Sequence, residues 1–369
     1  MKIGILTITP NVGFGGIMQA YALKYTLEKM GHKVRVINYT KKYTITEKIR
    51  YFTKACLKKI SGHYVKFSFE SDYNYRSQNV SSFIKNHLGM TNKVSNTKDL
   101  QYLINNNFDA VVVGSDQVWR PKYVLGIKNY FLDGINKEIR KLAYAASLGV
   151  NSWEYSKDDT AACAKLIKNF HYVSVRESNA RMLIADNLSY EGSVYCDLDP
   201  TLLAGKEAYL KFVQKKQTTR NIFTYILDKT NEKCDVIKKV ACETGYTINE
   251  FNTKAEDCNA PLCMRIAPPV EEWLNGLYNS DFVVTDSFHG CVFSILFNKP
   301  FIVYGNRQRG LDRFTSILDF LDLSDTLICS DGDFDKKLIE KSFNWVEINN
   351  KLESQRKEIV KRLKIVLDN

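Results

Sequence analysis

Short apolar runs alternate with amphipathic segments along most of the chain. Residues 2–9 form an apolar, β-rich run, and apolar residues recur at helical spacing over residues 17–30. Gly31 follows that helix as glycine often does beyond a helix C-terminus, and residues 34–39 form a second apolar run. Strand, glycine-rich turn, helix and strand make one βαβ unit, so the pattern predicts the start of a parallel sheet.

The same alternation returns after a stretch of different texture. Residues 40 to about 107 are polar, aromatic and basic, which predicts an insertion of helices and loops. Further strands are predicted at residues 108–113, 141–146, 171–175, 221–227, 246–251, 281–285 and 300–303. Helices are predicted at residues 158–170, 176–185, 232–243, 270–280, 290–297 and 351–367.

Strands separated by helices indicate parallel sheets with crossover helices. The pattern breaks near residues 197–205, so we predict an α/β protein with two Rossmann-like domains that face a cleft. The first domain covers residues 1–200 with the insertion at about 40–107, and the second covers 201–345. Residues 346–369 form a terminal helix whose apolar stripe should pack back towards the N-terminal domain.

Length and charge narrow the picture further. The chain has 369 residues and a net charge of +11, which favours anionic partners: phosphorylated small molecules, an anionic membrane surface or nucleic acid. No nucleic-acid-binding module is recognisable, so no nucleic acid partner is expected. The chain has no apolar run of about 18 residues, and polar residues interrupt the N-terminal run where a signal peptide would continue. Nine scattered cysteines without a C-x-x-C pair indicate reduced thiols, so we expect a cytoplasmic protein.

Three strand-to-helix junctions carry candidate binding residues, because ligands of open α/β sheets bind beyond the carboxyl ends of strands. The first contains Asn11, Gly13, Gly15 and Gln19. Its glycines would let backbone N–H groups approach a substrate, and the helix N-terminus favours an anion. The alternative is a tight turn without a ligand.

The second junction places Ser115, Asp116 and Gln117 directly after an apolar strand. These side chains can bind substrate, or one of them can simply cap the next helix.

The third junction contains Asp286, Ser287 and His289 between a strand and an apolar helix. A neutral histidine at such a position can act as a general acid or base, and Asp286 can orient it or bind a hydroxyl. The alternative is a capped helix with a structurally packed histidine.

Arginines at strand ends provide candidate anion-binding groups, because guanidinium binds phosphate and carboxylate with two parallel hydrogen bonds. Arg176 follows one strand, and Arg307, Arg309 and Arg313 follow another. The alternative for each is a surface or ion-paired arginine. No cluster with metal-ligand spacing is evident, so no metal is expected.

These junctions together resemble the polysaccharide pyruvyl transferase family. The resemblance extends from residue 3 to about residue 320. The matching segments are Asn11-Val-Gly-Phe-Gly-Gly-Ile-Met-Gln-Ala-Tyr-Ala-Leu, Gly114-Ser-Asp-Gln-Val-Trp, Ala143-Tyr-Ala-Ala-Ser-Leu-Gly, Val173-Ser-Val-Arg-Glu, Leu198-Asp-Pro-Thr-Leu-Leu and Thr285-Asp-Ser-Phe-His-Gly.

The resemblance implies a GT-B-like enzyme that transfers an enolpyruvyl or pyruvate group, usually as a cyclic ketal, from phosphoenolpyruvate to sugar hydroxyls. The acceptor would be a sugar or lipid-linked oligosaccharide, a precursor of a cell-surface polysaccharide or exopolysaccharide. Phosphoenolpyruvate is the co-substrate, and no other cofactor is implied. In the family's donor site, Arg176 matches one arginine, whereas Ser287 stands where the arginine of an Arg-x-His motif would be. Arg307, Arg309 or Arg313 would then supply the missing charge.

The candidate residues suit this chemistry. Phosphoenolpyruvate carries a phosphate and a carboxylate, so at least two cations are expected. Protonation of its methylene carbon gives an oxocarbenium-like centre for a sugar hydroxyl to attack, which requires an acid and a base. His289 can serve one role, and Asp116 or Glu177 the other. The competing functions are a GT-B glycosyltransferase with a nucleotide-sugar donor and a non-catalytic carbohydrate- or polyanion-binding protein.

The insertion contains a basic amphipathic segment at residues 46–60. Its basic residues are Lys48, Arg50, Lys54, Lys58 and Lys59, and Ile49, Phe52, Cys56 and Ile60 lie at helical spacing. We expect a solvated helix whose apolar stripe packs on the domain. The alternative is a helix on an anionic membrane, which would make the protein peripheral at the inner membrane face.

Overall fold

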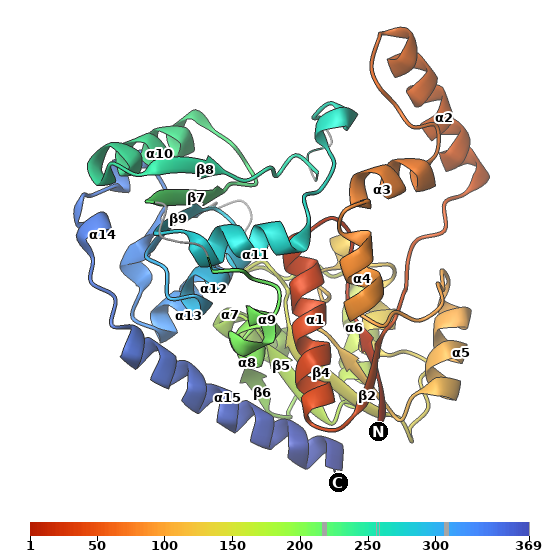
Figure 1. Ribbon diagram of the computed structural model, residues 1–369. Coiled ribbons are helices and arrows are strands. Elements are labelled where there is room, and N and C mark those ends of the chain that lie inside the picture. Colours follow the sequence, from red (N-terminus) through yellow and green to blue (C-terminus); the bar gives the residue numbers. More distant parts are fainter. Residues whose placement is uncertain (216–219, 256, 258, 306–309, 369) are drawn as a thin grey trace.

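The computed structural model describes residues 1–369 except 216–219, 256, 258, 306–309 and 369. Its strands form two separate sheets (Figure 1). The first part contains β1 (Lys2–Leu6), α1 (Phe14–Lys29), β2 (Lys33–Val36), α2 (Ile45–Ile60), α3 (Phe69–Ser77), α4 (Ser81–His87), α5 (Thr97–Asn107), β3 (Ala110–Val113), β4 (Arg140–Ala146), α6 (Lys157–Ile167), β5 (Tyr172–Val175), α7 (Ser178–Leu188), β6 (Val194–Cys196) and α8 (Pro200–Ala204). The second part contains α9 (Glu207–Leu210), β7 (Asn221–Tyr225), α10 (Asn231–Thr244), β8 (Thr247–Glu250), α11 (Val270–Asn279), β9 (Phe282–Thr285), α12 (Phe288–Leu296), β10 (Phe301–Tyr304), α13 (Asp312–Phe320), β11 (Leu327–Ile328), α14 (Lys337–Glu340) and α15 (Trp345–Asp368).

The first sheet is parallel, in the order β2-β1-β3-β4-β5-β6. Successive side chains of a strand point to opposite faces, and here both faces are buried. Ile3 and Ile5 join the core that includes α1, whereas Leu6 joins the core that includes α5, α6 and α7. This two-sided burial explains why the strands are continuous apolar runs.

The second sheet is also parallel, in the order β11-β10-β9-β7-β8. Ile222 packs with α10, and Phe223 packs with α11 and α12 on the other face. The prediction of an α/β protein with two Rossmann-like sheets is therefore confirmed.

Helix α1 joins the two halves of the molecule. Its first residue, Phe14, stacks on Trp273 of α11 with ring centroids 5.6 Å apart and also contacts Phe251 at 5.3 Å. The apolar core around α1 therefore continues into the second half. Packing of Phe14 explains why α1 begins three residues before the predicted start, even though Gly15 and Gly16 are weak helix formers.

Helix α15 runs along both halves (Figure 1). Near its N-terminus, Asn349 donates a hydrogen bond to Asn298 at 3.3 Å. Further along, Arg356 Nε donates to the carbonyl of Leu202 at 2.6 Å, and Arg362 pairs with Asp197 at 2.7 Å. The domain boundaries at residues 200 and 345 remain a proposal.

Several elements escaped the sequence pattern. Strands β6 and β11 are too short to give a periodic signal, and α13 was not predicted. Among the helices that the structure describes, none combines the length and the apolar character needed to cross a membrane.

Candidate active site

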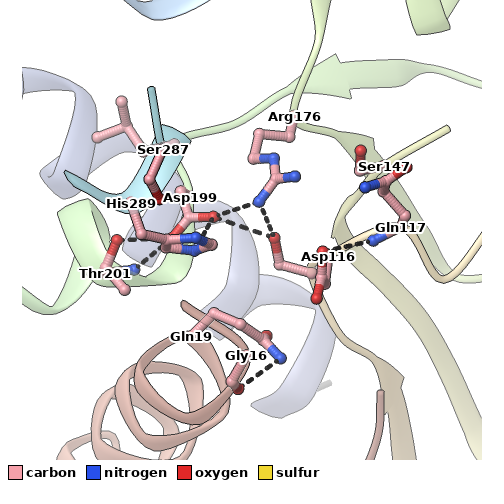
Figure 2. Close-up of polar contacts among 12 residues, drawn as sticks. Gly16, Gln19, Asp116, Gln117, Ser147, Arg176, Asp199, Thr201, Ser287 and His289 are labelled. Atoms are coloured by element: carbon pink, nitrogen blue, oxygen red, sulfur yellow. Dashed lines mark hydrogen bonds and ion pairs between the residues drawn. The ribbon is translucent and has the colours of Figure 1, made fainter. Parts of the chain in front are cut away.

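The carboxyl ends of strands from both sheets meet beside the N-terminus of α1. Helices α7, α8 and α12 also begin there, directly after β5, β6 and β9. Figure 2 shows Arg176, Asp199 and His289 pointing toward one another at this junction. Arg176 and Asp199 come from the first half of the chain and His289 from the second, so only the docking of the two halves assembles the cluster.

Asp199 is the buried centre of the cluster. Its Oδ2 accepts hydrogen bonds from Arg176 Nη1 at 2.7 Å and from Ser115 Oγ at 3.3 Å. Its Oδ1 accepts from the backbone N–H and the hydroxyl of Thr201 at 2.9 and 2.6 Å. Asp199 caps α8, and Pro200 occupies the first helical position, where a missing N–H is harmless. The cap therefore fixes the carboxylate, with Oδ2 facing the cation.

His289 approaches Asp199 from the second half of the molecule. Its Nε2 lies 3.7 Å from Asp199 Oδ2, which is ion-pair distance but longer than a hydrogen bond. On its other side, the ring lies against α1. The contact is so close that a Cβ added to Gly15 would come within 2.2 Å of His289 Nδ1. Gly15 is thus required for close approach of a histidine, whereas the sequence suggested close approach of a ligand.

Arg176 has hydrogen-bonding capacity left over. Its Nη1 bonds Asp199, and its Nε lies 3.6 Å from Glu177 Oε1. Nε and Nη2 are buried and make no hydrogen bond to any described residue. Its guanidinium also lies 4.4 Å from the ring centre of Phe288, which contributes a cation–π contact across the two halves.

A second guanidinium lies nearby. Arg313 of α13 lies 5.9 Å from the same Phe288 ring. Burial and the like charge of Arg176 lower the pKa of Arg313, partly offset by Glu177 and Asp116. Ser287, in place of the family's arginine, accepts a hydrogen bond from Gly290 N–H and caps α12. Arg313 thus supplies the second positive charge of the site, which the uncharged Ser287 cannot supply. Arg307 and Arg309 lie outside the described residues.

The charges of the cluster perturb one another. Burial by itself would raise the pKa of Asp199, but His289 and Arg176 outweigh it and hold that pKa well below its usual range. Burial opposes the charge of Arg176, yet Asp199 and Glu177 raise its pKa overall. Asp199 and Arg176 therefore form a permanently charged pair.

Glu177 behaves in the opposite way. It is fully buried, and burial raises its pKa, while Arg176 and a hydrogen bond donated by Ser147 offset this only in part. Its charged form is therefore disfavoured in the folded protein.

Replacing Glu177 by glutamine should stabilise the protein increasingly as the pH rises. A carboxyl group whose pKa is higher in the folded than in the unfolded state lowers the free energy of unfolding once the pH exceeds the unfolded pKa of about 4.3. Glutamine removes the cost and can still accept the bond from Ser147. The melting temperature of E177Q minus that of the wild type should grow between pH 4 and pH 8. The exposed Glu353→Gln serves as the control, and a difference that shrinks with pH would contradict the assignment.

Asp116 borders the same site. Its backbone is left-handed, with φ of 76°, and such conformations often occur at functional positions. The side chain is partly exposed, and a Cβ on Gly16 of α1 would lie 3.9 Å from Asp116 Oδ2. The neighbouring Ser115 also receives a long hydrogen bond of 3.4 Å from Arg176. Asp116 is thus the carboxylate with access to solvent at this edge.

Other predicted site residues have structural partners instead. Asp286 is buried and accepts hydrogen bonds from the backbone N–H groups of Leu227 and Asp228 and from Lys233 Nζ, at 2.6, 3.0 and 2.7 Å. Its carboxylate thus holds the loop after β7 and does not approach His289.

Four further predicted residues also have structural surroundings of their own. Gln117 accepts from Arg120 at 3.1 Å and packs on Gly149. Gln19 is buried on α1 and donates to Thr7 at 2.9 Å. Asn11 is exposed and precedes α1. Gly13 is the N-terminal cap residue of α1, and no side chain caps this end of the helix.

Sequence reasoning missed Asp199 and Phe288. Asp-Pro three residues after the apolar residues 194–196 was a usable signal for Asp199, because it marks a helix start near a strand end. The sequence suggested a domain boundary there instead. Within the described ranges, no group of three or more His, Cys, Asp or Glu side chains is arranged to hold a metal ion.

Comparison with solved structures gives the fold. The chain aligns with UDP-GlcNAc 2-epimerase from Methanocaldococcus jannaschii at a TM-score of 0.54 and 16% identity, covering 99% of this chain and 100% of that one. It aligns equally well with S. aureus MnaA, solved with UDP, at a TM-score of 0.54 and 13% identity, covering 100% and 97%. The fold is therefore GT-B-like, as expected.

Comparison at the sequence level gives the family. No curated protein matched the chain significantly. The profile of the family described as "Polysaccharide pyruvyl transferase" matches residues 14–308, which include α1, the Arg176–Asp199 pair and His289. A match over most of the chain, together with the assembled junctions, shows that this chain belongs to the polysaccharide pyruvyl transferase family.

Proposed function

We propose that this protein transfers pyruvate from phosphoenolpyruvate to two hydroxyls of one sugar and forms a cyclic ketal. The observation that carries the proposal is the buried cluster of Arg176, Asp199 and His289, with Arg313 beside it. A small donor with both a carboxylate and a phosphate matches two neighbouring guanidinium groups. The uncapped N-terminus of α1 adds further attraction for an anion.

Each residue has a role that its surroundings support. Arg176 has two buried nitrogen atoms that form no hydrogen bond with the described residues, and these would bind donor oxygens. His289, beside the anionic Asp199, would protonate the methylene carbon of the donor. Asp116, partly exposed at the same edge, would accept the proton of the attacking sugar hydroxyl. Attack by a second hydroxyl on the same carbon then breaks the bond from that carbon to the phosphate oxygen and closes the ketal, and phosphate leaves with the proton of the second hydroxyl.

Entry of the substrates would require the halves to separate at this junction. His289 and Arg176 are nearly inaccessible to solvent. Ser178 of α7 also contacts Ser316 of α13 across the halves at 3.0 Å. We propose that the acceptor is a sugar or lipid-linked oligosaccharide precursor of a surface polysaccharide and that the reaction takes place in the cytoplasm.

Phosphoenolpyruvate should raise the melting temperature by several degrees, because a ligand at about 100 times its Kd stabilises the native state by about 2.7 kcal/mol. Arg176→Lys should abolish most of this shift, since an ammonium cannot replace the guanidinium fork. The exposed Arg181→Lys, on helix α7 that follows Arg176, is the matched control. UDP-sugars should leave the melting temperature unchanged.

Product analysis completes the test. Incubation with phosphoenolpyruvate and lipid-linked or nitrophenyl glycosides should add the mass of pyruvic acid minus water to the acceptor. Stabilisation by a nucleotide-sugar alone, with glycosyl transfer as the product, would replace this proposal with the glycosyltransferase function.

A further inference from the structure

Helix α2 leaves an apolar face uncovered. It projects away from both sheets (Figure 1). The side chains of Ile45, Ile49, Phe52 and Ile60 are 77%, 58%, 51% and 83% exposed, and Leu57, on a neighbouring side of the helix, is 65% exposed. Phe67, in the segment after the helix, lies 5.8 Å from Phe52 between ring centres and is 45% exposed. The sequence predicted that this stripe would pack on the domain, and that prediction is wrong.

A different side of α2 makes the contacts with the rest of the protein. Tyr51 packs against Phe69 at 4.2 Å, and Ala55 is buried on the same side. With about 100° per residue, Ile45, Ile49, Phe52, Cys56 and Ile60 fall within an arc of about 80° that faces elsewhere. The helix also has its own N-terminal capping box between Thr44 and Glu47. The contacts of α2 with the rest of the protein therefore use one side of the helix and leave the stripe exposed.

The charged residues around the stripe are almost all basic. Residues 41–67 contain eight basic side chains against one acidic side chain, Glu47, a net +7 out of +11 for the chain. The basic residues are Lys41, Lys42, Lys48, Arg50, Lys54, Lys58, Lys59 and Lys66. Glu47 is already paired with Lys41 at 2.6 Å. Lys48 and Lys59 border one edge of the stripe, whereas Lys54 and Lys58 lie on the opposite side of the helix.

We propose that α2 docks the protein on an anionic lipid surface, with the apolar stripe inserted at the level of the headgroups. An apolar stripe bordered by lysines matches a bilayer interface, which offers both apolar depth and negative charge. A second copy of the chain would bring two basic faces together without acidic partners. Nucleic acid would use the charge but not the isoleucines. This inference stands independently of the proposed function.

The test is sedimentation of the full chain with vesicles of phosphatidylcholine, with and without phosphatidylglycerol. The wild type should bind only the anionic vesicles. The double variant Ile49→Ser/Phe52→Ser should lose at least about 100-fold in partitioning, since each buried side chain contributes strongly to insertion. Because both residues are exposed, the melting temperature and the activity on a soluble acceptor should stay unchanged.

Two matched charge pairs test the orientation. Lys48→Gln/Lys59→Gln should weaken binding by about 30-fold, because each basic residue near the lipid contributes about fivefold. Lys54→Gln/Lys58→Gln, with the same charge change on the far side, should weaken it by less than about fivefold. These variants alter no apolar contact, so they test the proposal even if the serine variant folds poorly.

Other outcomes would overturn the proposal. Equal binding to neutral and anionic vesicles, or no binding to either, excludes docking driven by lipid charge. Equal losses for the two lysine pairs indicate a diffuse attraction to polyanions. A dimer that forms without lipid and dissociates in the serine variant assigns the stripe to contact between copies of the chain.

Discussion

Replacing His289 by alanine should lower the turnover of pyruvate transfer by about 10²–10⁴-fold, the usual contribution of one general acid or base. The ring lies between Asp199 and Gly15 at the meeting point of both halves, and histidine is the side chain that ordinarily exchanges protons near neutral pH. The measurements are kcat at saturating phosphoenolpyruvate and the mass of the product.

The control for this variant is His63→Ala, because His63 is exposed beyond the end of α2. It should retain full turnover on a soluble acceptor. The melting temperature of each variant separates loss of chemistry from loss of structure. Near-normal turnover of a folded H289A protein would shift the acid role to Asp116.

Asp199→Asn should reduce both stability and turnover. At pH 7 the unfolding free energy should fall by about 3–5 kcal/mol, because Arg176 is left as an uncompensated buried charge. Asp199 Oδ2 also lies 3.7 Å from His289 Nε2, so loss of its charge should lower kcat by about 10²-fold, the lower end of the contribution of one general acid. Urea unfolding and steady-state kinetics measure the two effects.

The stability difference should depend on pH with a defined sign. The pKa of Asp199 is depressed in the folded state, so its contribution is present above the unfolded value of about 3.9 and is lost as the pH falls below it. The gap between wild type and D199N should therefore narrow from pH 7 to pH 3. A gap that widens on acidification would show that the carboxylate does not stabilise the fold.

Asp197→Asn is a closely matched control. Asp197 is also buried, two residues away, but it pairs with Arg362 and Tyr172 outside the cluster. Its replacement should destabilise the protein and leave kcat nearly unchanged. Equal loss of kcat in both variants would mean that Asp199 acts only through the fold.

Most of the helices and strands, and the resemblance to the family, follow from the sequence alone. Strands buried on both faces are continuous apolar runs, and helices repeat with their own period, so both signals are local. The ordered motifs at strand ends named Arg176, His289 and Ser115, which the structure does bring to one junction. Parallel strands make this possible, because their carboxyl ends necessarily share one edge of the sheet.

The use of those strand ends depends on packing between residues that are distant in the chain. Asp286 and Asp199 both follow apolar strands, yet Lys233 and a loop engage the first, whereas Arg176 and His289 surround the second. The packing of Gly15 against His289 likewise depends on how α1 docks between the sheets.

The same limit applies to α2. Its sequence showed an amphipathic, basic helix, but amphipathicity does not reveal whether a stripe is covered. Coverage depends on contacts with residues distant in the chain, and here Tyr51 and Ala55 make those contacts while the stripe stays exposed. Local periodicity therefore predicts the helix, whereas packing against distant residues determines which of its faces stays exposed to a partner.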